Sequence, residues 1–199
     1  MFIIGKKISM TQIFQDDGTV VPVTIVAVEP MIVTGVKTKE IAGYDAVQYG
    51  YGTAKNAGKR LVGAAKGLSF TPRNYKEQRG TSSANRGDLI TLDEVKVGDM
   101  VKVVATSKAK GFQGAMKRHG FHGLPSSHGH KAVKRHVGSI GQRFPQHTLK
   151  GMRMAGRMGG ERTTVRGLKI MAVDSATSRI AIKGALPGRN GSQVVITTL

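Results

Sequence analysis

The residues with the most distinctive chemistry in this chain are six histidines, all of which lie between residues 100 and 160. His119 and His122 are three positions apart, and a single glycine separates His128 from His130, so pairs of imidazoles could share a metal ion. The same span contains no Cys, Asp or Glu, so every ligand would have to be a histidine. We therefore predict no metal site and no cofactor, and a His-ligated metalloenzyme is the least favoured alternative.

Catalytic constellations are also missing from this span. Ser126, Ser127 and His128 are adjacent, but no carboxylate is available nearby to orient the histidine or to act as a general base. No glycine-rich phosphate loop ending in Gly-Lys-Ser or Gly-Lys-Thr is present in the chain. We predict that the chain is not an enzyme and has no small-molecule substrate.

Cations, rings and glycines do form a pattern in residues 100–160, which hold twelve Lys and Arg and no acidic residue. Cations attract phosphates of any sequence, rings and guanidinium planes stack on unpaired bases, and glycines let backbone amides approach phosphate oxygens. This combination predicts a nucleic-acid interface. The predicted contact residues are Lys108, Lys110, Phe112, Lys117, Arg118, His119, His128, His130, Lys131, Lys134, Arg135, Arg143, Lys150, Arg153, Arg157 and Arg162.

A flexible charged loop without a fixed partner is the plainer alternative, but it would leave the rings and glycines of this span without a role. Three methionines, Met152, Met154 and Met158, lie among glycines that disfavour a helix. We expect them to make adaptable apolar contacts with RNA or with a neighbouring protein.

The net charge of +19 is concentrated in the same part of the chain. Residues 108–169 carry 14 Lys and Arg against one acid, whereas residues 1–107 carry 14 against ten and residues 170–199 carry three against one. A nearly one-signed field of this kind predicts an acidic partner for the central segment.

Cysteine is absent, which suits a reducing compartment, and the apolar run before Lys6 is too short for a signal peptide. No stretch approaches the roughly 18 apolar residues of a membrane span. We expect a soluble, cytoplasmic protein with no membrane partner.

The elements that position the basic segment are predicted to be short strands. Residues 2–28 have the pattern of a β-hairpin that turns at residues 16–18. Further strands are expected at 32–37, 46–49, 89–92, 168–173, 180–182 and 194–196, together with a hairpin at 95–105 that turns at Gly98 and Asp99. Short strands at this spacing favour a mainly β barrel or sandwich built from both ends of the chain, residues 1–107 and 163–199. The basic loop, residues 108–162, is inserted between them and is expected to be extended.

Residues 53–87 interrupt the strand pattern with five glycines and eight cations that face one acid, Glu77. We expect a small irregular excursion with a short helix near residues 56–65. Its proposed secondary nucleic-acid contacts are Lys59, Arg60, Arg73 and Arg79. A solvated surface excursion without a partner is an equally good interpretation.

Several sequence segments match the motifs of one protein family and occur in the same order as in that family. They are GKKISMTQIFQDDGTVVPVTIVAVEP, GYDAVQYGYG, TSKAKGFQGAMKRHGF, SSHGHK, GSIGQR, KGMRMAGRMGGERTTV and IKGALPGRNGSQVVI. The chain resembles large-subunit ribosomal protein three of the bacterial type. The resemblance places the family signature on Ser107, Lys110, Gly111, Gly114 and Arg118, and the tip of the loop on residues 127–143.

The resemblance implies a six-stranded barrel of the translation-elongation-factor type. It also implies a structural protein that binds large-subunit ribosomal RNA near its 3′ end, nucleates assembly, contacts neighbouring large-subunit proteins and sends its loop toward the peptidyl-transferase region. The chain departs from the family at Ser9, Ala109 and Lys102. Many members carry a methylated glutamine where this chain has Phe144, so we do not predict that modification.

Two alternatives to a cytoplasmic ribosomal protein stay open at this point. A ribosome of an organelle would use the same chemistry. A DNA-compacting architectural protein would share the charge, but it should have a dimerisation surface and a weak sequence preference.

Overall fold

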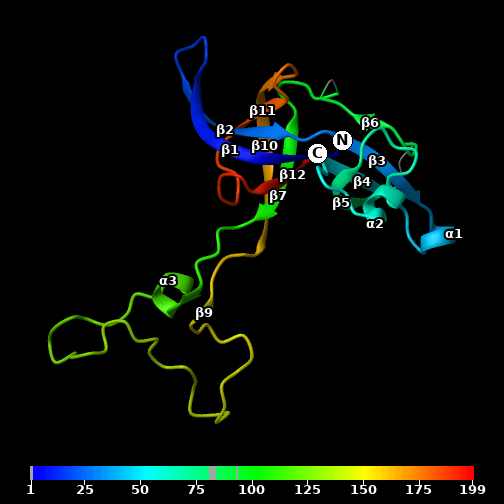
Figure 1. The fold of residues 1–199 in the computed structure, drawn as a ribbon. Helices are drawn as coiled ribbons and strands as arrows, with labels where there is room; N and C mark the ends of the chain where they lie inside the picture. The colour runs from blue at the N-terminus through cyan, green and yellow to red at the C-terminus, as the bar shows by residue number, and fades with distance from the viewer. Residues whose placement is uncertain (1, 81–83, 93) are drawn as a thin grey trace. The chain divides into compact units, whose positions relative to one another are not determined.

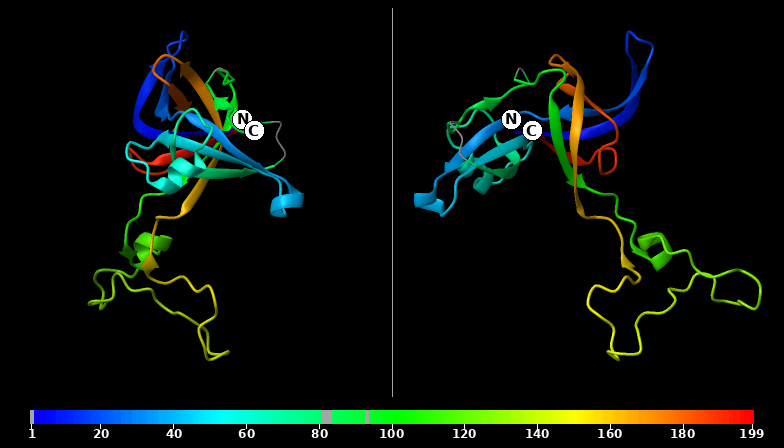
Figure 2. Two further views of the ribbon diagram at one scale, coloured as in Figure 1. Left: turned by 45° about the vertical axis from the view of Figure 1, so that its right-hand side comes forward. Right: turned by 180° about the vertical axis from the view of Figure 1, so that it is seen from behind.

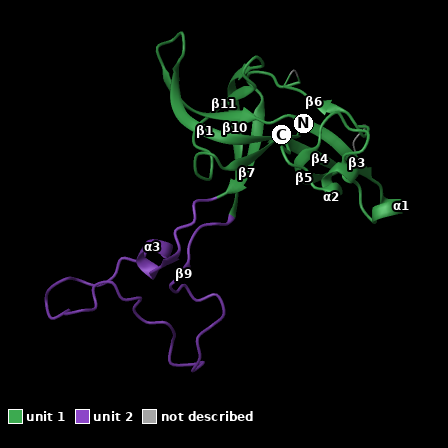
Figure 3. Ribbon diagram, in the orientation of Figure 1, with its two compact units in different colours: residues 1–106, 162–199 green, residues 107–161 purple. Residues whose placement is uncertain are grey.

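The computed structural model describes residues 2–80, 84–92 and 94–199, and it confirms that the chain is mainly β. The chain forms two compact units, Met1–Thr106 with Arg162–Leu199 and Ser107–Glu161 (Figure 3). Both ends of the chain belong to the first unit, where Phe2 pairs with Thr197. Each unit is therefore described by itself.

Six strands of the first unit close into an antiparallel barrel in the order β1-β12-β7-β10-β11-β2 (Figures 1 and 2). These strands are β1 (Phe2–Phe14), β2 (Val20–Val28), β7 (Met100–Thr106), β10 (Arg162–Asp174), β11 (Arg179–Lys183) and β12 (Gln193–Thr198). Both arms of the predicted hairpin at residues 2–28 are present as β1 and β2. That this barrel is of the translation-elongation-factor type stays a prediction.

Strands β1, β7 and β12 are apolar on both faces because each face packs on a different core. Val103 and Ile196 point into the barrel with the other members of its cluster, since alternate side chains of a strand lie on opposite faces. Ile4, Val104 and Val195 belong to a second cluster, together with residues of a neighbouring sheet. This double burial explains the continuous apolar runs of these strands, which are otherwise unusual in an antiparallel sheet.

The neighbouring sheet has four strands in the order β5-β4-β3-β6. They are β3 (Met31–Lys37), β4 (Ala46–Thr53), β5 (Pro72–Arg79) and β6 (Leu89–Ile90). The strands predicted at 32–37, 46–49 and 89–92 therefore exist, and they lie in the first unit as a separate sheet beside the barrel strands. They separate from the barrel because Met31, Val33 and Tyr49 bury one face of their sheet against the outside of β1, β7 and β12.

Residues 53–87 are more regular than predicted. The expected helix is present as α2 (Lys59–Ala64), and α1 (Lys39–Ala42) precedes the excursion. Strand β5 was missed because its sequence, PRNYKEQR, is almost entirely polar. As the edge strand of the sheet it buries little, and edge strands with charged side chains resist pairing with other chains. Residues 81–83 of the predicted excursion lie outside the described residues.

The predicted hairpin at 95–105 is wrong in its first arm. Strand β7 begins at Met100, and the preceding residues form turns in which Gly98 N donates to the Ile170 carbonyl at 2.8 Å. Leu92 and Val95 are nevertheless buried in the barrel cluster. Their apolar spacing therefore indicates contact with the core rather than a strand.

The second unit contains three short elements, β8 (Phe112–Gln113), α3 (Ala115–His119) and β9 (Gly156–Arg157), joined by turns. Ala115 is the one buried residue in the whole span 107–161. A segment with so little buried surface has no core to offset the entropy of ordering, as its composition indicates. Across the part of the chain that the structure describes, no helix is long and apolar enough to cross a membrane.

Candidate nucleic-acid interface

Backbone hydrogen bonds pair the two ends of the second unit with each other. We call these paired ends, residues 107–113 and 156–161, the neck. Ser107 N donates to the Glu161 carbonyl at 2.9 Å, and Lys110 N donates to the Met158 carbonyl at 2.9 Å. Strands β8 and β9 continue the pairing, with Phe112 opposite Arg157. The neck therefore brings residues from both ends of the predicted basic loop side by side.

Gly159 allows the two sides of the neck to approach each other. Its φ is +72°, and an ideal Cβ at this position would lie 2.1 Å from the Lys108 carbonyl oxygen. A side chain would clash with backbone there, so only glycine fits. This close approach gives Gly159 a structural role within the neck.

Helix α3 is tied to the opposite side of the neck by two side chains of its last turn. Arg118 Nη1 donates to the Met154 carbonyl at 2.8 Å, and His119 Nε2 lies 3.0 Å from the same oxygen. Gly156 leaves room for this arrangement, because an ideal Cβ there would lie 2.7 Å from Arg118 Nη1. Arg118 and His119 were predicted as RNA contacts, and the structure gives both an intramolecular partner.

The neck and α3 enclose a hollow of about 620 Å³ with a strongly basic lining. It is lined by Ser107, Lys108, Lys110, Arg118, His119, Arg157, Met158, Gly159 and Glu161. Four of these residues are Lys or Arg and one is an acid, so the hollow should attract an anion. Its cationic donors suit phosphate groups of a nucleic-acid backbone.

The part of the second unit beyond α3 is a series of turns. Leu124 N donates to the Lys134 carbonyl at 3.0 Å, which closes residues 124–134 into a loop. Gly123 makes this closure possible, since its φ is +76° and a Cβ would lie 2.2 Å from the Lys134 carbonyl oxygen. A smaller hollow of about 320 Å³ follows, lined by Ser139, Gly141, Gln142, Pro145, His147, Leu149 and Met152.

Most of the predicted contact residues are exposed. Arg118, His119 and His130 are half-buried, and Arg162 lies on β10 in the first unit. The exposed residues are Lys108, Lys110, Phe112, Lys117, His128, Lys131, Lys134, Arg135, Arg143, Lys150, Arg153, Arg157 and Arg162. Exposed cations and an exposed ring can meet phosphates and bases without rearrangement of a core.

The predicted secondary contacts are exposed on the four-stranded sheet and its helix. Lys59 and Arg60 lie on α2, Arg73 lies on β5, and Arg79 on β5 stacks over the Tyr44 ring at 5.2 Å.

Lys76 on β5 was not among the predicted contacts, but it interacts electrostatically with one of them, Arg162. Partial burial of its ammonium group, and to a smaller extent the charge of Arg162, lower the pKa of Lys76. The tertiary structure thus places the excursion and the end of the predicted basic loop within electrostatic reach of each other.

Phe144 is a second candidate that sequence reasoning did not select. Its side chain is 83% exposed, more than that of Phe112 at 77%, so both rings could stack on unpaired bases. The sequence did contain the pattern that would predict it, because Phe144 is an aromatic residue next to Arg143 in the acid-free segment. Phe112 was predicted from the same pattern.

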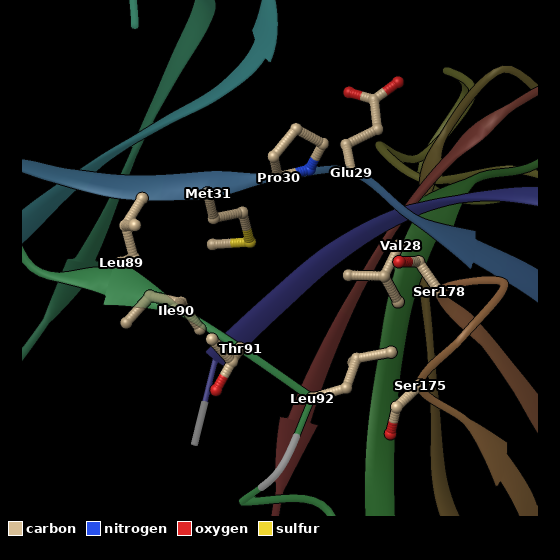
Figure 4. Close-up of a pocket in the computed structure, with 10 residues that line it drawn as sticks. All are labelled: Val28, Glu29, Pro30, Met31, Leu89, Ile90, Thr91, Leu92, Ser175 and Ser178. Atoms are coloured by element: carbon tan, nitrogen blue, oxygen red, sulfur yellow. The ribbon is translucent and has the colours of Figure 1, made fainter. Parts of the chain in front are cut away.

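A hollow of about 500 Å³ lies in the first unit, where β2 ends, β3 begins and β6 lies (Figure 4). It is lined by Val28, Glu29, Pro30, Met31, Leu89, Ile90, Thr91, Leu92, Ser175 and Ser178. These described lining residues include no cation, so this hollow lacks the charge of a phosphate site.

The histidines do not form a metal site in the part of the chain that the structure describes, where no group of three or more His, Cys, Asp or Glu is arranged to hold an ion. The rings of His119 and Phe121 lie 5.9 Å apart in a tilted arrangement.

Fold and surface together define a β-barrel protein with a cationic, almost coreless insertion, the architecture of a nucleic-acid-binding structural protein. Comparison with known proteins makes this more specific. The model of the family described as Ribosomal protein L3 matches residues 84–187.

Similar proteins cover nearly the full length of this chain. The large ribosomal subunit protein uL3 of Borrelia hermsii (strain HS1 / DAH) is 46% identical, over 98% of this chain and 95% of its own. The proteins of the same name from Corynebacterium jeikeium (strain K411) and Thermobifida fusca (strain YX) are 44% and 43% identical, over 98% of this chain and 93% and 94% of theirs.

The chain therefore belongs to the ribosomal protein L3 family. The family resemblance read from the sequence motifs is confirmed. Because the family consists of ribosomal proteins, the prediction that the chain is not an enzyme is confirmed as well.

Proposed function

We propose that this protein is a structural constituent of the large ribosomal subunit and that it binds large-subunit ribosomal RNA through its second unit. It would act without catalysis and without a cofactor. Its partners would be the ribosomal RNA and neighbouring large-subunit proteins, and its location the ribosome.

The observation that carries this proposal is the exposed, almost entirely positive charge of the second unit. Ten of its Lys and Arg side chains are exposed, whereas Ala115 is its one buried residue. A segment of this kind gains its order from a polyanion rather than from a core. The relatives named uL3 support ribosomal RNA as this polyanion, because a large ribosomal subunit contains ribosomal RNA.

The full chain should bind fragments of large-subunit ribosomal RNA more tightly than duplex DNA of equal length. The comparison belongs at about 0.15 M salt, where exposed charges more than ~8 Å apart are screened and non-specific attraction is reduced. Filter binding or fluorescence anisotropy would measure both affinities. Equal affinities would favour the DNA-compacting alternative and would overturn the proposal.

The finer parts of the proposal come from the family resemblance. The protein would bind near the 3′ end of the RNA and nucleate assembly, and the segment 127–143 would extend toward the peptidyl-transferase region. A cross-linking map of the protein within assembled large subunits tests this. Cross-links from residues 127–143 to RNA remote from the peptidyl-transferase region would contradict it.

A further inference from the structure

The hairpin formed by β1 and β2 has a charge pattern opposite to that of the second unit. Residues 8–36 contain no Lys, Arg or His, and their charged residues are Asp16, Asp17 and Glu29. In a chain with a net charge of +19, a run of 29 residues without a cation is as unusual as the acid-free span 100–160.

This hairpin extends beyond the barrel as a two-stranded ribbon (Figures 1 and 2). Strand β12 pairs with β1 only as far as Lys6, and β11 pairs with β2 only from Val23 to Ala27. The pairing of β1 with β2 continues to Phe14 opposite Val20. The turn is well formed, with Thr19 N donating to Asp17 Oδ1 at 2.8 Å.

The two faces of the ribbon differ in burial but not in polarity. Val21 and Val23 are buried on one face, with Ile13 beside them half-buried. On the other face, Thr24 lies opposite Met10 and is buried where β2 pairs with β11. The remaining residues of this face are Met10, Gln12, Phe14, Val20 and Pro22. All five are exposed, Phe14 to 67% and Met10 to 48%.

A ribbon with one buried face normally places polar residues on the other. Here four of the five outward residues are apolar. We call this surface, Met10, Gln12, Phe14, Val20 and Pro22, the hairpin face. Exposed apolar side chains grouped on one surface mark an interaction site.

We propose that the hairpin face is a docking surface for a positively charged protein of the large subunit, through a segment that carries apolar side chains flanked by Lys or Arg. The acidic tip residues Asp16 and Asp17 are exposed and would attract such a segment. RNA does not fit, because residues 8–28 of the hairpin contain no cation for phosphates and the carboxylates of its tip repel them. This inference rests on the proposed ribosomal function and adds the chemistry of a second interface.

The test is site-specific photocross-linking in reconstituted large subunits. One full-length variant carries p-benzoylphenylalanine in place of Phe14, and a matched variant carries it in place of Phe112, which is similarly exposed in the second unit. Each would be assembled with large-subunit ribosomal RNA and the total protein of large subunits depleted of the natural copy of this chain. We expect the Phe112 probe to cross-link to RNA and the Phe14 probe to a protein peptide of net positive charge.

The outcomes separate this inference from the proposed function. If the Phe112 probe reaches RNA while the Phe14 probe reaches RNA, a second copy of this chain, an uncharged or acidic peptide, or nothing, the docking inference is wrong and the proposed function stands. If neither variant enters the particle, both are wrong.

Charge reversal provides an independent check on the chemistry of the partner. In the Phe14 probe background, Asp16→Lys should reduce the yield of the protein cross-link several-fold, because it places a cation against a cationic partner. Glu40→Lys changes the net charge by the same amount on α1, away from the hairpin face, and should leave the yield unchanged. Equal yields in the two variants would contradict the proposed charge complementarity.

Discussion

Two glycines of the second unit have left-handed backbones but very different surroundings. A Cβ on Gly123 would lie 2.2 Å from the Lys134 carbonyl oxygen, whereas a Cβ on Gly129 would meet nothing within 4 Å. Their φ angles, +76° and +81°, are nearly the same. The pair therefore separates the cost of a left-handed alanine from the cost of a lost close contact.

We expect Gly123→Ala to weaken binding to a large-subunit RNA fragment far more than Gly129→Ala does. Both variants pay about 1–2 kcal/mol for the left-handed residue, but only the first also forces residues 123 and 134 apart. Anisotropy titrations of the two variants against wild type would measure this. Equal losses would show that the closed loop does not determine the binding geometry.

Lys7 and Lys6 are sequence neighbours in different environments. Lys7 is buried on β1, and its Nζ donates to the carbonyl oxygens of Leu186 at 2.8 Å and Gly188 at 3.5 Å. Lys6 is exposed and forms an ion pair with Glu29. A buried carbonyl that loses its donor costs more than an exposed ion pair contributes.

Lys7→Met should therefore lower the free energy of unfolding by about 1–3 kcal/mol, and Lys6→Met by less than about 1 kcal/mol. Urea denaturation of both variants followed by circular dichroism makes the comparison. If Lys7→Met were as stable as wild type, the anchoring of residues 186–188 by Lys7 would not contribute to stability.

At the scale of elements, β7 and β10 are paired up to the point where the chain leaves the first unit. Thr106 lies opposite Arg162 in an antiparallel register. A two-residue turn can join such a pair directly. The barrel should therefore fold without the second unit.

Replacing residues 107–161 by Asn-Gly should leave the first unit folded, with a melting temperature close to that of the full chain and unchanged β-sheet circular dichroism. The same variant should lose most of its affinity for large-subunit RNA. Loss of folding in this variant would show that the barrel depends on the inserted unit.

A polar network links β3, β4 and β5 on the outside of the four-stranded sheet. Glu77 receives hydrogen bonds from Lys37 Nζ, from the Tyr44 hydroxyl at 2.9 Å and from Gln48 Nε2 at 3.3 Å. The bond from Lys37 lowers the pKa of Glu77 most, and the Tyr44 bond adds to it. A carboxyl whose pKa is lowered by folding stabilises the native state above its unfolded pKa.

This contribution should be lost as the pH falls through the lowered pKa of Glu77, below its ordinary value of 4.5. The network is exposed, so its size should be no more than about 1 kcal/mol. Wild type and Glu77→Gln should therefore differ in urea midpoint at pH 7 and converge near pH 3. A difference that persists at low pH would assign the effect to packing instead of charge.

For the whole molecule, the distribution of charge predicts a strong dependence of RNA affinity on salt. If about ten cations of the second unit contact phosphates, the logarithm of the affinity should fall against the logarithm of salt concentration with a slope of about −7 to −9. The variant that lacks residues 107–161 is the control, and its slope should be much flatter. A similar slope for both proteins would place the interface on the first unit.

Local patterns predicted both arms of the first hairpin and the strands around Val103, Ile180 and Ile196, because alternation and turn residues are short-range signals. They did not predict β5, whose polar residues obtain their partner, β4, from across the sheet. They also did not show that Arg118 binds the Met154 carbonyl. That contact joins residues 36 positions apart, and nothing in the types of the two residues marks it.

The sequence alone determines how charge is distributed along the chain and in which order the family motifs occur. The acid-free span 100–160 and the cation-free span 8–36 are properties of composition, which no folding can change, and the motifs identified the family. Only the tertiary structure decided which strands close into the barrel and which form a second sheet, because apolar strands occur in both sets and differ in which face is covered. It also decided that Phe14 points outward on the hairpin face, since the burial of a side chain depends on pairing between distant segments.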